Sequence, residues 1–141
     1  MVVLDDLSTD VAPVAIVGAG SIGAGWAIVF ATAGRPVRLH DTAPERLTTA
    51  LAEIGARLAD LQEFGLLREA PAAILARIAG TPDLNDCVAG AGHVQECVPE
   101  QLELKRAVFA DLDVCSPADC PIASSSSFMT ASTLAGGLPG R

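Results

Sequence analysis

The chain alternates short apolar runs of strand length with longer stretches in which apolar residues recur every three or four positions. The apolar runs cover residues 14–17, 36–40, 93–98 and 122–123. The stretches between them have the periodicity of helices that bury one face. Strands that alternate with helices predict a parallel sheet with right-handed crossovers and helices on both faces, which is a doubly wound α/β fold.

The first predicted helix covers residues 21–33 and ends before Gly34, a residue type that is common just after helix C-termini. Its apolar side chains share one stripe: Ile22, Trp26, Val29, Phe30 and Ala33. We therefore predict that Trp26 packs in the core, where its indole N–H needs a hydrogen-bond acceptor.

The second predicted helix begins near Thr42 and ends before Gly65. Thr42 is a candidate N-cap, Pro44 suits the first turn, and Glu45 lies at the positive end of the helix dipole. Five apolar residues form one stripe that is expected to pack on the sheet: Leu47, Leu51, Ile54, Leu58 and Leu61.

Further helices are predicted at residues 71–79, 84–89, 99–112 and 130–134. Residues 78–81 also fit a short strand, and the sequence leaves both possibilities open. The helix over 99–112 is expected to open with Pro99 and Glu100. Its inward face is predicted from three apolar positions: Leu104, Val108 and Leu112.

A glycine-rich turn joins the first strand to the first helix in the pattern Gly18-x-Gly20-x-x-Gly23, with Ser21 and Ile22 between the last two glycines. Gly18 permits a tight exit from the strand, Gly20 lets the backbone approach a pyrophosphate, and Gly23 allows close packing of helix on strand. The N–H groups at the start of the helix then face the anion. The turn predicts a dinucleotide site in a Rossmann-type sheet.

A carboxylate at the end of the second strand supports this interpretation. Asp41 lies 18 residues past Gly23, near the distance at which an acidic residue accepts hydrogen bonds from the adenosine ribose hydroxyls. The same charge repels a 2′-phosphate, so NAD is the predicted cofactor rather than NADP. The alternative is an ordinary glycine turn followed by a chance acidic residue.

Composition and charge exclude several classes of protein. The 141 residues fit one domain over residues 11–141 after a polar lead at 1–10, and half of them are hydrophobic. A net charge of −8 gives no electrostatic footprint for nucleic acid or an anionic membrane. The acidic lead does not resemble a signal peptide, so we expect a cytoplasmic protein. Four cysteines without paired spacing predict reduced thiols and no metal site.

Three segments, in this order along the chain, resemble the NAD-binding domain of the 3-hydroxyacyl-CoA dehydrogenase family. They are AIVGAGSIG at residues 15–23, QECVPEQLELK at 95–105 and ASSSS at 123–127. The resemblance covers residues 12–141 and is strongest to the gulonate 3-dehydrogenase, or lambda-crystallin, branch. It implies an NAD-dependent oxidoreductase that transfers a hydride between NAD and the 3-hydroxyl of a 3-hydroxy acid or a 3-hydroxyacyl-CoA.

The resemblance also implies roles for single residues. Glu100 and Lys105 match a Glu and a Lys near the nicotinamide half of NAD, and Ser126 matches a catalytic-site Ser that hydrogen-bonds the substrate hydroxyl. Such groups can balance anionic charge and orient a hydroxyl for hydride transfer. From the residues alone, Lys105 fits an ordinary surface lysine, and the serine run fits a solvated loop.

Four departures from the family pattern affect the expected activity. Ser124 stands where the acyl-CoA branch has an Asn, and Arg57 is the one basic residue in the second half of the second helix, so a small 3-hydroxy acid is favoured over a CoA thioester. Family members carry a catalytic His after the serine segment, which neither His40 nor His93 matches. The helical domain expected beyond Arg141, which would complete the substrate pocket and form a homodimer, is also missing.

Without that general base we expect the chain to bind NAD and turn over little or no substrate, since proton removal contributes about 10²–10⁴-fold to rate. A second hypothesis is an NAD-binding sensor, or a module that needs a partner chain for catalysis. A third is a flavin domain, which nothing beyond the glycine turn supports.

Overall fold

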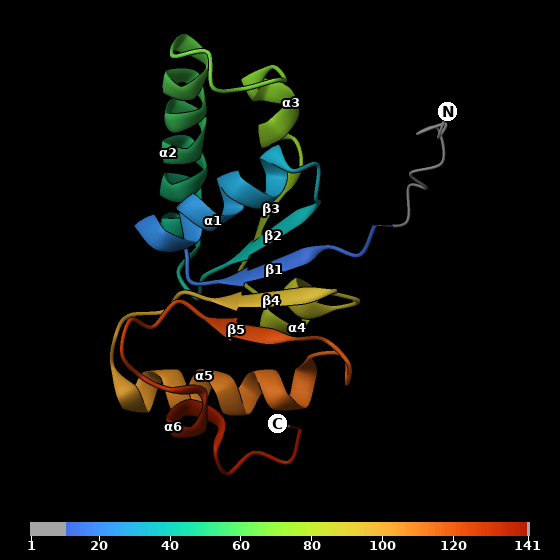
Figure 1. Cartoon of the computed structure of the whole chain (residues 1–141), viewed down its shortest axis with the longest axis vertical. Helices are drawn as coiled ribbons and strands as arrows, with labels where there is room; N and C mark the ends of the chain where they lie inside the picture. The colour runs from blue at the N-terminus through green and yellow to red at the C-terminus, as the bar shows by residue number, and fades with distance from the viewer. Residues whose placement is uncertain (1–10, 141) are drawn as a thin grey trace.

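The computed structural model describes residues 11–140 and contains a five-stranded, fully parallel sheet (Figure 1). The strands are β1 (Val14–Val17), β2 (Val37–His40), β3 (Ile78–Thr81), β4 (His93–Glu96) and β5 (Ile122–Ser124). Their order across the sheet is β3-β2-β1-β4-β5, so the chain moves outward from β1 in both directions. This order confirms the predicted doubly wound fold.

Six helices connect and follow the described strands. They are α1 (Ser21–Thr32), α2 (Pro44–Glu63), α3 (Pro71–Leu75), α4 (Leu84–Val88), α5 (Leu102–Cys115) and α6 (Ala131–Ala135). The helices α1, α2 and α3 pack together on one face of the sheet, and α4 and α5 lie on the other. Two apolar layers therefore enclose the sheet, as parallel sheets require.

The strand register brings all carboxyl ends to one edge, on the left in Figure 1. Val17 is paired with His40 on one side and with Glu96 on the other, and Glu96 is paired with Ser124. Side chains and loops that follow these positions must therefore meet at the same edge. Ligands of doubly wound folds bind there, where the strand order reverses beside β1.

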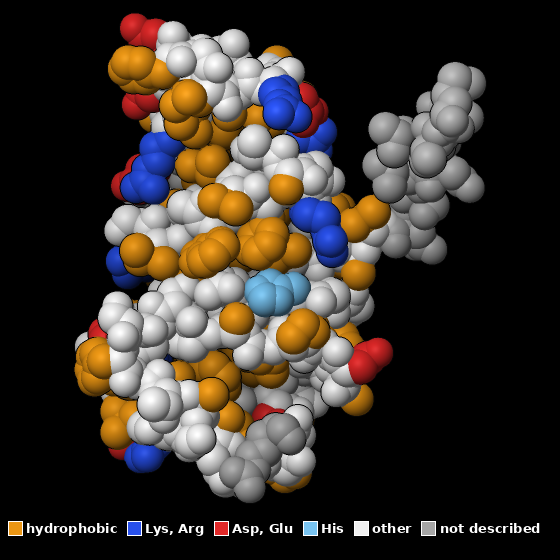
Figure 2. Space-filling view, viewed as in Figure 1, with side chains coloured by type: hydrophobic (Ala, Val, Ile, Leu, Met, Phe, Trp, Pro, Cys, Tyr) orange, Lys and Arg blue, Asp and Glu red, His pale blue; other side chains and the backbone are white. Residues whose placement is uncertain are grey.

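The predicted core position of Trp26 is wrong. Trp26 is 36% exposed, and Ile22 and Val29, on the same stripe, are 60% and 55% exposed. The buried face of α1 consists of small residues: Gly23, Ala24, Ala27 and Ala31. They let the helix approach the sheet closely, so the large side chains point outward and gather over α1 in Figure 2. The predicted need for an indole acceptor is confirmed, because Trp26 donates to Ser125.

The buried stripe of α2 is confirmed, with Ile54 and Leu58 inaccessible to solvent, but the helix packs mainly on α1 and α3 and reaches the sheet at β3. Its N-cap differs from the prediction, because Ala43 and not Thr42 occupies that position. The N–H of Ala43 donates instead to the carboxylate of Asp41, 3.1 Å away, which satisfies the helix start without a capping side chain of its own.

The alternative between helix and strand at residues 78–81 is resolved in favour of the strand. The preceding helix, α3, ends at Leu75, and β3 pairs with β2 along its whole length. Ile78 alone is buried in this strand, and Gly80 lies beside Leu47 and Leu51 of α2. Tertiary packing at the sheet edge therefore selects the extended form.

The predicted start of α5 at Pro99 and Glu100 is wrong. The helix begins at Leu102, and the N–H of Gln101 turns back to the carbonyl of Pro99, 2.7 Å away. The loop also shifts the inward face, which consists of Lys105, Phe109 and Leu112, and leaves Leu104 38% exposed. A lysine replaces the predicted leucine in the core.

Candidate functional site

Two adjoining cavities form a groove along the carboxyl edge of the sheet. The larger, of about 290 Å³, reaches from the glycine turn to Glu100, Lys105 and Ser125. The smaller, of about 260 Å³, lies at the end of β2. The two share Gly18, Asp41, Arg46, Val98 and Pro99 as lining residues.

The glycine turn has the close contacts that the motif predicts. Gly18 has a φ of +108°, and a Cβ there would lie 2.7 Å from the carbonyl oxygen of Cys97. A Cβ on Gly23 would lie 1.9 Å from the carbonyl oxygen of Gly18. Both positions therefore exclude every side chain, since real Cβ contacts are not this short.

The start of α1 is open toward the larger cavity. Gly20 is the N-cap, no side chain caps the helix, and a Cβ at Gly20 would meet nothing within 4 Å. Gly20, Ser21 and Ile22 all line the cavity. The first N–H groups of a helix have no intrahelical partner and carry the positive end of the dipole. This arrangement suits a pyrophosphate.

Asp41 braces the turn at the end of β2. One carboxylate oxygen accepts from the N–H of Ala19 and the other from the N–H of Ala43, each at 3.1 Å. Each oxygen keeps a further lone pair, so the carboxylate can also accept hydrogen bonds from the hydroxyl groups of a ribose. Asp41 lines both cavities, and its predicted role at the adenosine ribose stays a prediction.

The smaller cavity has apolar walls on the side of β4 and α5. Val98, Pro99, Leu104 and Val108 line it together with Asp41. A narrow apolar slot beside a ribose-binding carboxylate is suited to a flat aromatic base, since such sites combine apolar walls with a few polar groups. We expect the adenine ring there.

Lys105 forms a buried ion pair at the other end of the groove. Its ammonium lies 2.7 Å from a carboxylate oxygen of Glu96, and the side chains are 1% and 0% exposed. Lys105 also donates to the carbonyl of Val98 at 3.0 Å, and Glu96 accepts from the N–H of Val98 at 2.7 Å. The surface interpretation of Lys105 is therefore wrong.

Glu96 completes a polar network that the sequence analysis missed. Its second carboxylate oxygen accepts a hydrogen bond from the Ser124 hydroxyl at 2.5 Å, and Ser124 in turn accepts from the N–H of Ser126 at 3.1 Å. The signal was present in the sequence: a carboxylate in a central strand of a sheet that is covered on both faces needs a buried partner. Lys105 is that partner.

The hydroxyl groups of the serine segment after β5 point to different partners. The hydroxyl of Ser126 donates to the carboxylate of Glu100 and accepts from the N–H of Met129 at 3.0 Å. Among residues 11–140, Ser125 and not Ser126 lines the larger cavity. The structure thus brings Glu100, Lys105 and Ser126 to the same end of the groove, with Ser126 attached to Glu100.

Ser125 is the centre of a second set of contacts. Its hydroxyl oxygen lies 3.1 Å from the indole nitrogen of Trp26, 2.8 Å from the amide nitrogen of Gln95 and 3.2 Å from the sulfur of Cys97. Burial raises the pKa of the Cys97 thiol, and the hydrogen bond with Ser125 opposes that shift in part. The thiol is therefore held in its neutral form at neutral pH.

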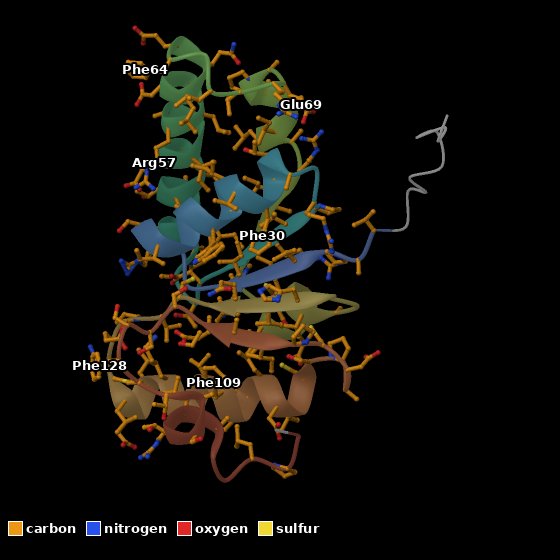
Figure 3. The ribbon with its side chains drawn as sticks, viewed as in Figure 1. Phe30, Arg57, Phe64, Glu69, Phe109 and Phe128 are labelled. Carbon is orange, nitrogen blue, oxygen red and sulfur yellow. The ribbon has the colours of Figure 1, made fainter. Side chains whose placement is uncertain are left out.

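Two arginines lie beside the groove on α2. Arg46 lines both groove cavities and a third, of about 480 Å³, between α2 and the start of α1. Arg57 lines the third cavity only, where it lies 3.9 Å from Glu53 and donates to the carbonyl of Ser21 at 3.4 Å. Figure 3 shows Arg57 on the outer side of α2.

The two histidines lie away from the predicted reacting end. His40 lines the smaller cavity and contacts the carbonyl of Thr81 at 3.1 Å, and His93 contacts Gln95 at 3.2 Å and the ring of Phe30. Within residues 11–140, the larger cavity is lined by no histidine. Neither His40 nor His93 is therefore placed to act on a group beside Glu100.

A parallel doubly wound sheet with an open glycine turn, a carboxylate after β2 and a groove along its carboxyl edge defines a Rossmann dinucleotide-binding domain. The model for the NAD-binding domain of 3-hydroxyacyl-CoA dehydrogenases matches residues 13–140. The chain belongs to this family, and its cofactor is NAD. The predicted family and the predicted cofactor are confirmed.

Curated relatives agree with the predicted branch. The chain is 45% identical over 127 residues to the lambda-crystallin homolog of Bos taurus, and 42% identical over 118 residues to the L-carnitine dehydrogenase of Streptomyces griseus. These matches cover 89% and 84% of the chain, but only 40% and 34% of the relatives. The chain therefore spans well under half of the length of the relatives it matches.

Solved structures show the same relationship. The 3-hydroxybutyryl-CoA dehydrogenase of Escherichia coli superposes with a TM-score of 0.85 at 33% identity, over 93% of this chain and 28% of that one. A lactate dehydrogenase of Cryptosporidium parvum, at 17% identity and a TM-score of 0.64, shares the fold alone.

Residues 11–140 contain neither a metal-binding cluster nor a membrane-spanning helix. No group of three or more His, Cys, Asp or Glu side chains is arranged to hold a metal ion. No helix in this range is long and apolar enough to cross a bilayer. The four cysteines, Cys87, Cys97, Cys115 and Cys120, are free thiols.

Proposed function

We propose that this chain is the cofactor-binding part of an NAD-dependent dehydrogenase that acts on a small 3-hydroxy acid. The observation that carries the proposal is the continuous groove that leads from Asp41 past the glycine turn to Glu100, Lys105 and the serine segment. NAD, when bound, accepts a hydride from a carbon that carries a hydroxyl group. The groove directs the reacting end of the cofactor toward that segment.

The chain's own residues have separate roles in this proposal. Asp41 holds the adenosine ribose, Gly18, Gly20, Ser21, Ile22 and Gly23 form the pyrophosphate cradle, and Lys105 keeps a positive charge beneath the nicotinamide end. Ser126, oriented by Glu100, hydrogen-bonds the substrate hydroxyl. These groups orient the substrate and balance charge, while removal of the hydroxyl proton is the task that the family resemblance assigns to a histidine, and no histidine among residues 11–140 lines the larger cavity.

A small acid is preferred over a CoA thioester for two reasons. Arg57, the basic residue in the second half of α2, is already engaged by Glu53 and Ser21. The name of one relative is L-carnitine dehydrogenase, and carnitine is a small 3-hydroxy acid. We also propose that residues 11–141 are one domain, that the protein is cytoplasmic, and that dimer formation needs a further domain.

Calorimetric titration of the chain with NADH and NADPH, repeated for Asp41→Ala, tests cofactor binding. We expect NADH to bind more tightly than NADPH, and Asp41→Ala to remove most of that preference, since the ribose hydroxyls lose their acceptor and the 2′-phosphate loses a repelling charge. Equal affinity of the unmodified chain for NADH and NADPH would contradict the proposed role of Asp41 at the adenosine ribose.

The second candidate is an NAD-binding module without catalysis of its own, and the absence of a histidine from the larger cavity favours it. Assays of the isolated chain with 3-hydroxybutyrate, carnitine, gulonate and 3-hydroxybutyryl-CoA separate the two. We expect NAD binding with little or no NADH formation. Turnover at ordinary enzyme rates would show that a histidine beside the groove is not needed. Recovery of turnover with a second, histidine-bearing domain supplied in trans would favour the dehydrogenase.

A further inference from the structure

Four side chains from α1, β4 and the ends of β4 and β5 meet at the larger cavity: Trp26, Gln95, Cys97 and Ser125. None of these four side chains has a role in the proposed cofactor or substrate binding. Ser125 lies at the centre, and both Ser125 and Cys97 line the cavity. Figure 1 shows the carboxyl end of β5 and the start of α1 at the same edge of the molecule.

The hydrogen-bonding capacity of the Ser125 hydroxyl is fully used. An indole nitrogen only donates, so the oxygen accepts from Trp26 at 3.1 Å. It also accepts from the amide nitrogen of Gln95 at 2.8 Å, because the amide oxygen of that residue faces the ring of His93. With both lone pairs engaged, the hydroxyl proton is directed to the sulfur of Cys97, 3.2 Å away.

A hydroxyl with three partners has no free position for a substrate, so its contribution is geometric. The N–H of Ser125 also donates to the carbonyl of Glu96 at 2.9 Å. Ser125 is thus held by α1, by β4 and by the backbone of Glu96. The residues on either side are placed by the same anchor, which turns Ser124 toward Glu96 and Ser126 toward Glu100.

We propose that Ser125 and Trp26 are positioning residues for the nicotinamide end of the cofactor site. They connect α1, which carries the pyrophosphate cradle, to the serine segment, and so fix the distance between the two. The inference rests on the proposed binding of NAD in this groove. The adenosine end, at Asp41, lies on the opposite side of β1 and does not depend on this connection.

The test compares two ligands that differ at one end. NADH occupies the whole groove, whereas ADP-ribose lacks the nicotinamide. Calorimetry of Ser125→Ala and Trp26→Phe should show NADH affinity reduced by about 3- to 10-fold, the range expected for one lost hydrogen bond. ADP-ribose affinity should change by less than about 2-fold. Trp26→Phe preserves an aromatic ring beside Phe30, whose centroid lies 5.6 Å from that of Trp26.

The control is Ser132→Ala on α6, away from the groove, which should leave both affinities unchanged. Thermal unfolding checks that each variant folds. If Ser125→Ala does not fold, the comparison of the two ligands is made with Trp26→Phe alone. Equal weakening of NADH and ADP-ribose, or no change in either, overturns the positioning role while cofactor binding stands. An unmodified chain that binds neither ligand overturns the proposed function as well.

Discussion

The two ends of the groove are built from different parts of the polypeptide. Around β1 and α1 the backbone itself makes the surface, because Gly18 and Gly23 bring strand, turn and helix into contact. Around the ends of β4 and β5, side chains make it, because Glu96, Lys105 and Ser124 satisfy one another in the interior. The first end depends on close backbone contacts, and the second depends on a buried pair of opposite charges.

This difference teaches how each end tolerates change. A backbone surface is disrupted when atoms are added at its points of close contact, whereas a side-chain network is disrupted when one partner is removed.

Removal of one partner of the buried pair should be the most damaging change. Lys105→Met leaves the Glu96 carboxylate buried without its counter-charge, and we expect a loss of about 3–5 kcal/mol in the free energy of unfolding. Denaturant unfolding measures it. The double variant Glu96→Gln with Lys105→Met removes both charges and should be more stable than Lys105→Met alone. A double variant that is less stable would mean that the pair is not a coupled unit.

Addition of a methyl group to the glycine turn should be nearly as damaging. Gly23→Ala places a Cβ 1.9 Å from a backbone oxygen, so α1 must move away from β1, at an expected cost of about 2–3 kcal/mol and with loss of NADH binding. Gly25→Ala on the same helix is the matched control. Its Cβ would meet nothing within 4 Å, and it should stabilise the helix by about 0.5–1 kcal/mol.

The buried thiol of Cys87, which lies beneath β1 and β2, should affect the pH dependence of stability. Burial raises the pKa of the Cys87 thiol from 9.0 to about 12, where its sulfur faces the carbonyls of Ile16 and Arg38. Above pH 9 the unfolded chain loses this proton and the folded chain keeps it. The stabilisation is therefore complete below pH 9 and decreases as pH rises toward 12.

Unfolding measured at pH 8 and pH 10 should differ by about 1–2 kcal/mol from this group, since one pH unit corresponds to about 1.4 kcal/mol. Cys87→Ala should reduce the pH dependence by that amount, although a small cavity lowers its stability at both pH values. The same slope in both proteins would assign the effect to other thiols.

The smallest effect is expected at Asp41, the side chain that braces the backbone end. Asp41→Asn keeps one acceptor oxygen for Ala19 or Ala43 and loses the other together with the charge, so we expect a loss of about 1 kcal/mol in the free energy of unfolding. Thermal unfolding without cofactor measures it. Arg57→Ala, at an exposed ion pair, provides the scale for an unimportant contact and should change stability by less than about 0.5 kcal/mol.

The sequence predicted the backbone end more completely than the side-chain end. Glycine spacing follows from steric limits that are local in the chain, so the turn, α1 and Asp41 could be placed from residues 14–41 alone. The secondary structure of residues 78–81 could not be predicted, because these four residues fit both a helix end and a strand. Only pairing with β2 decides between the two.

The side-chain end depends on contacts across long stretches of sequence. Glu96 pairs with Lys105 and Ser124, and Ser125 with Trp26, 99 residues away. Helical periodicity placed Trp26 in the core, because apolar spacing identifies the stripe but not which stripe faces the sheet. The small residues of α1, which pack closely, were the better indicator.

The position of Trp26 also gives the molecule a built-in optical reporter. The chain has one tryptophan and no tyrosine, so near-ultraviolet excitation selects a single indole. That indole is hydrogen-bonded to a residue of the cofactor groove, and reduced nicotinamide absorbs in the range where indole emits. Binding of NADH should therefore quench the tryptophan fluorescence by energy transfer to the reduced nicotinamide. ADP-ribose has no such chromophore and should leave the fluorescence unchanged.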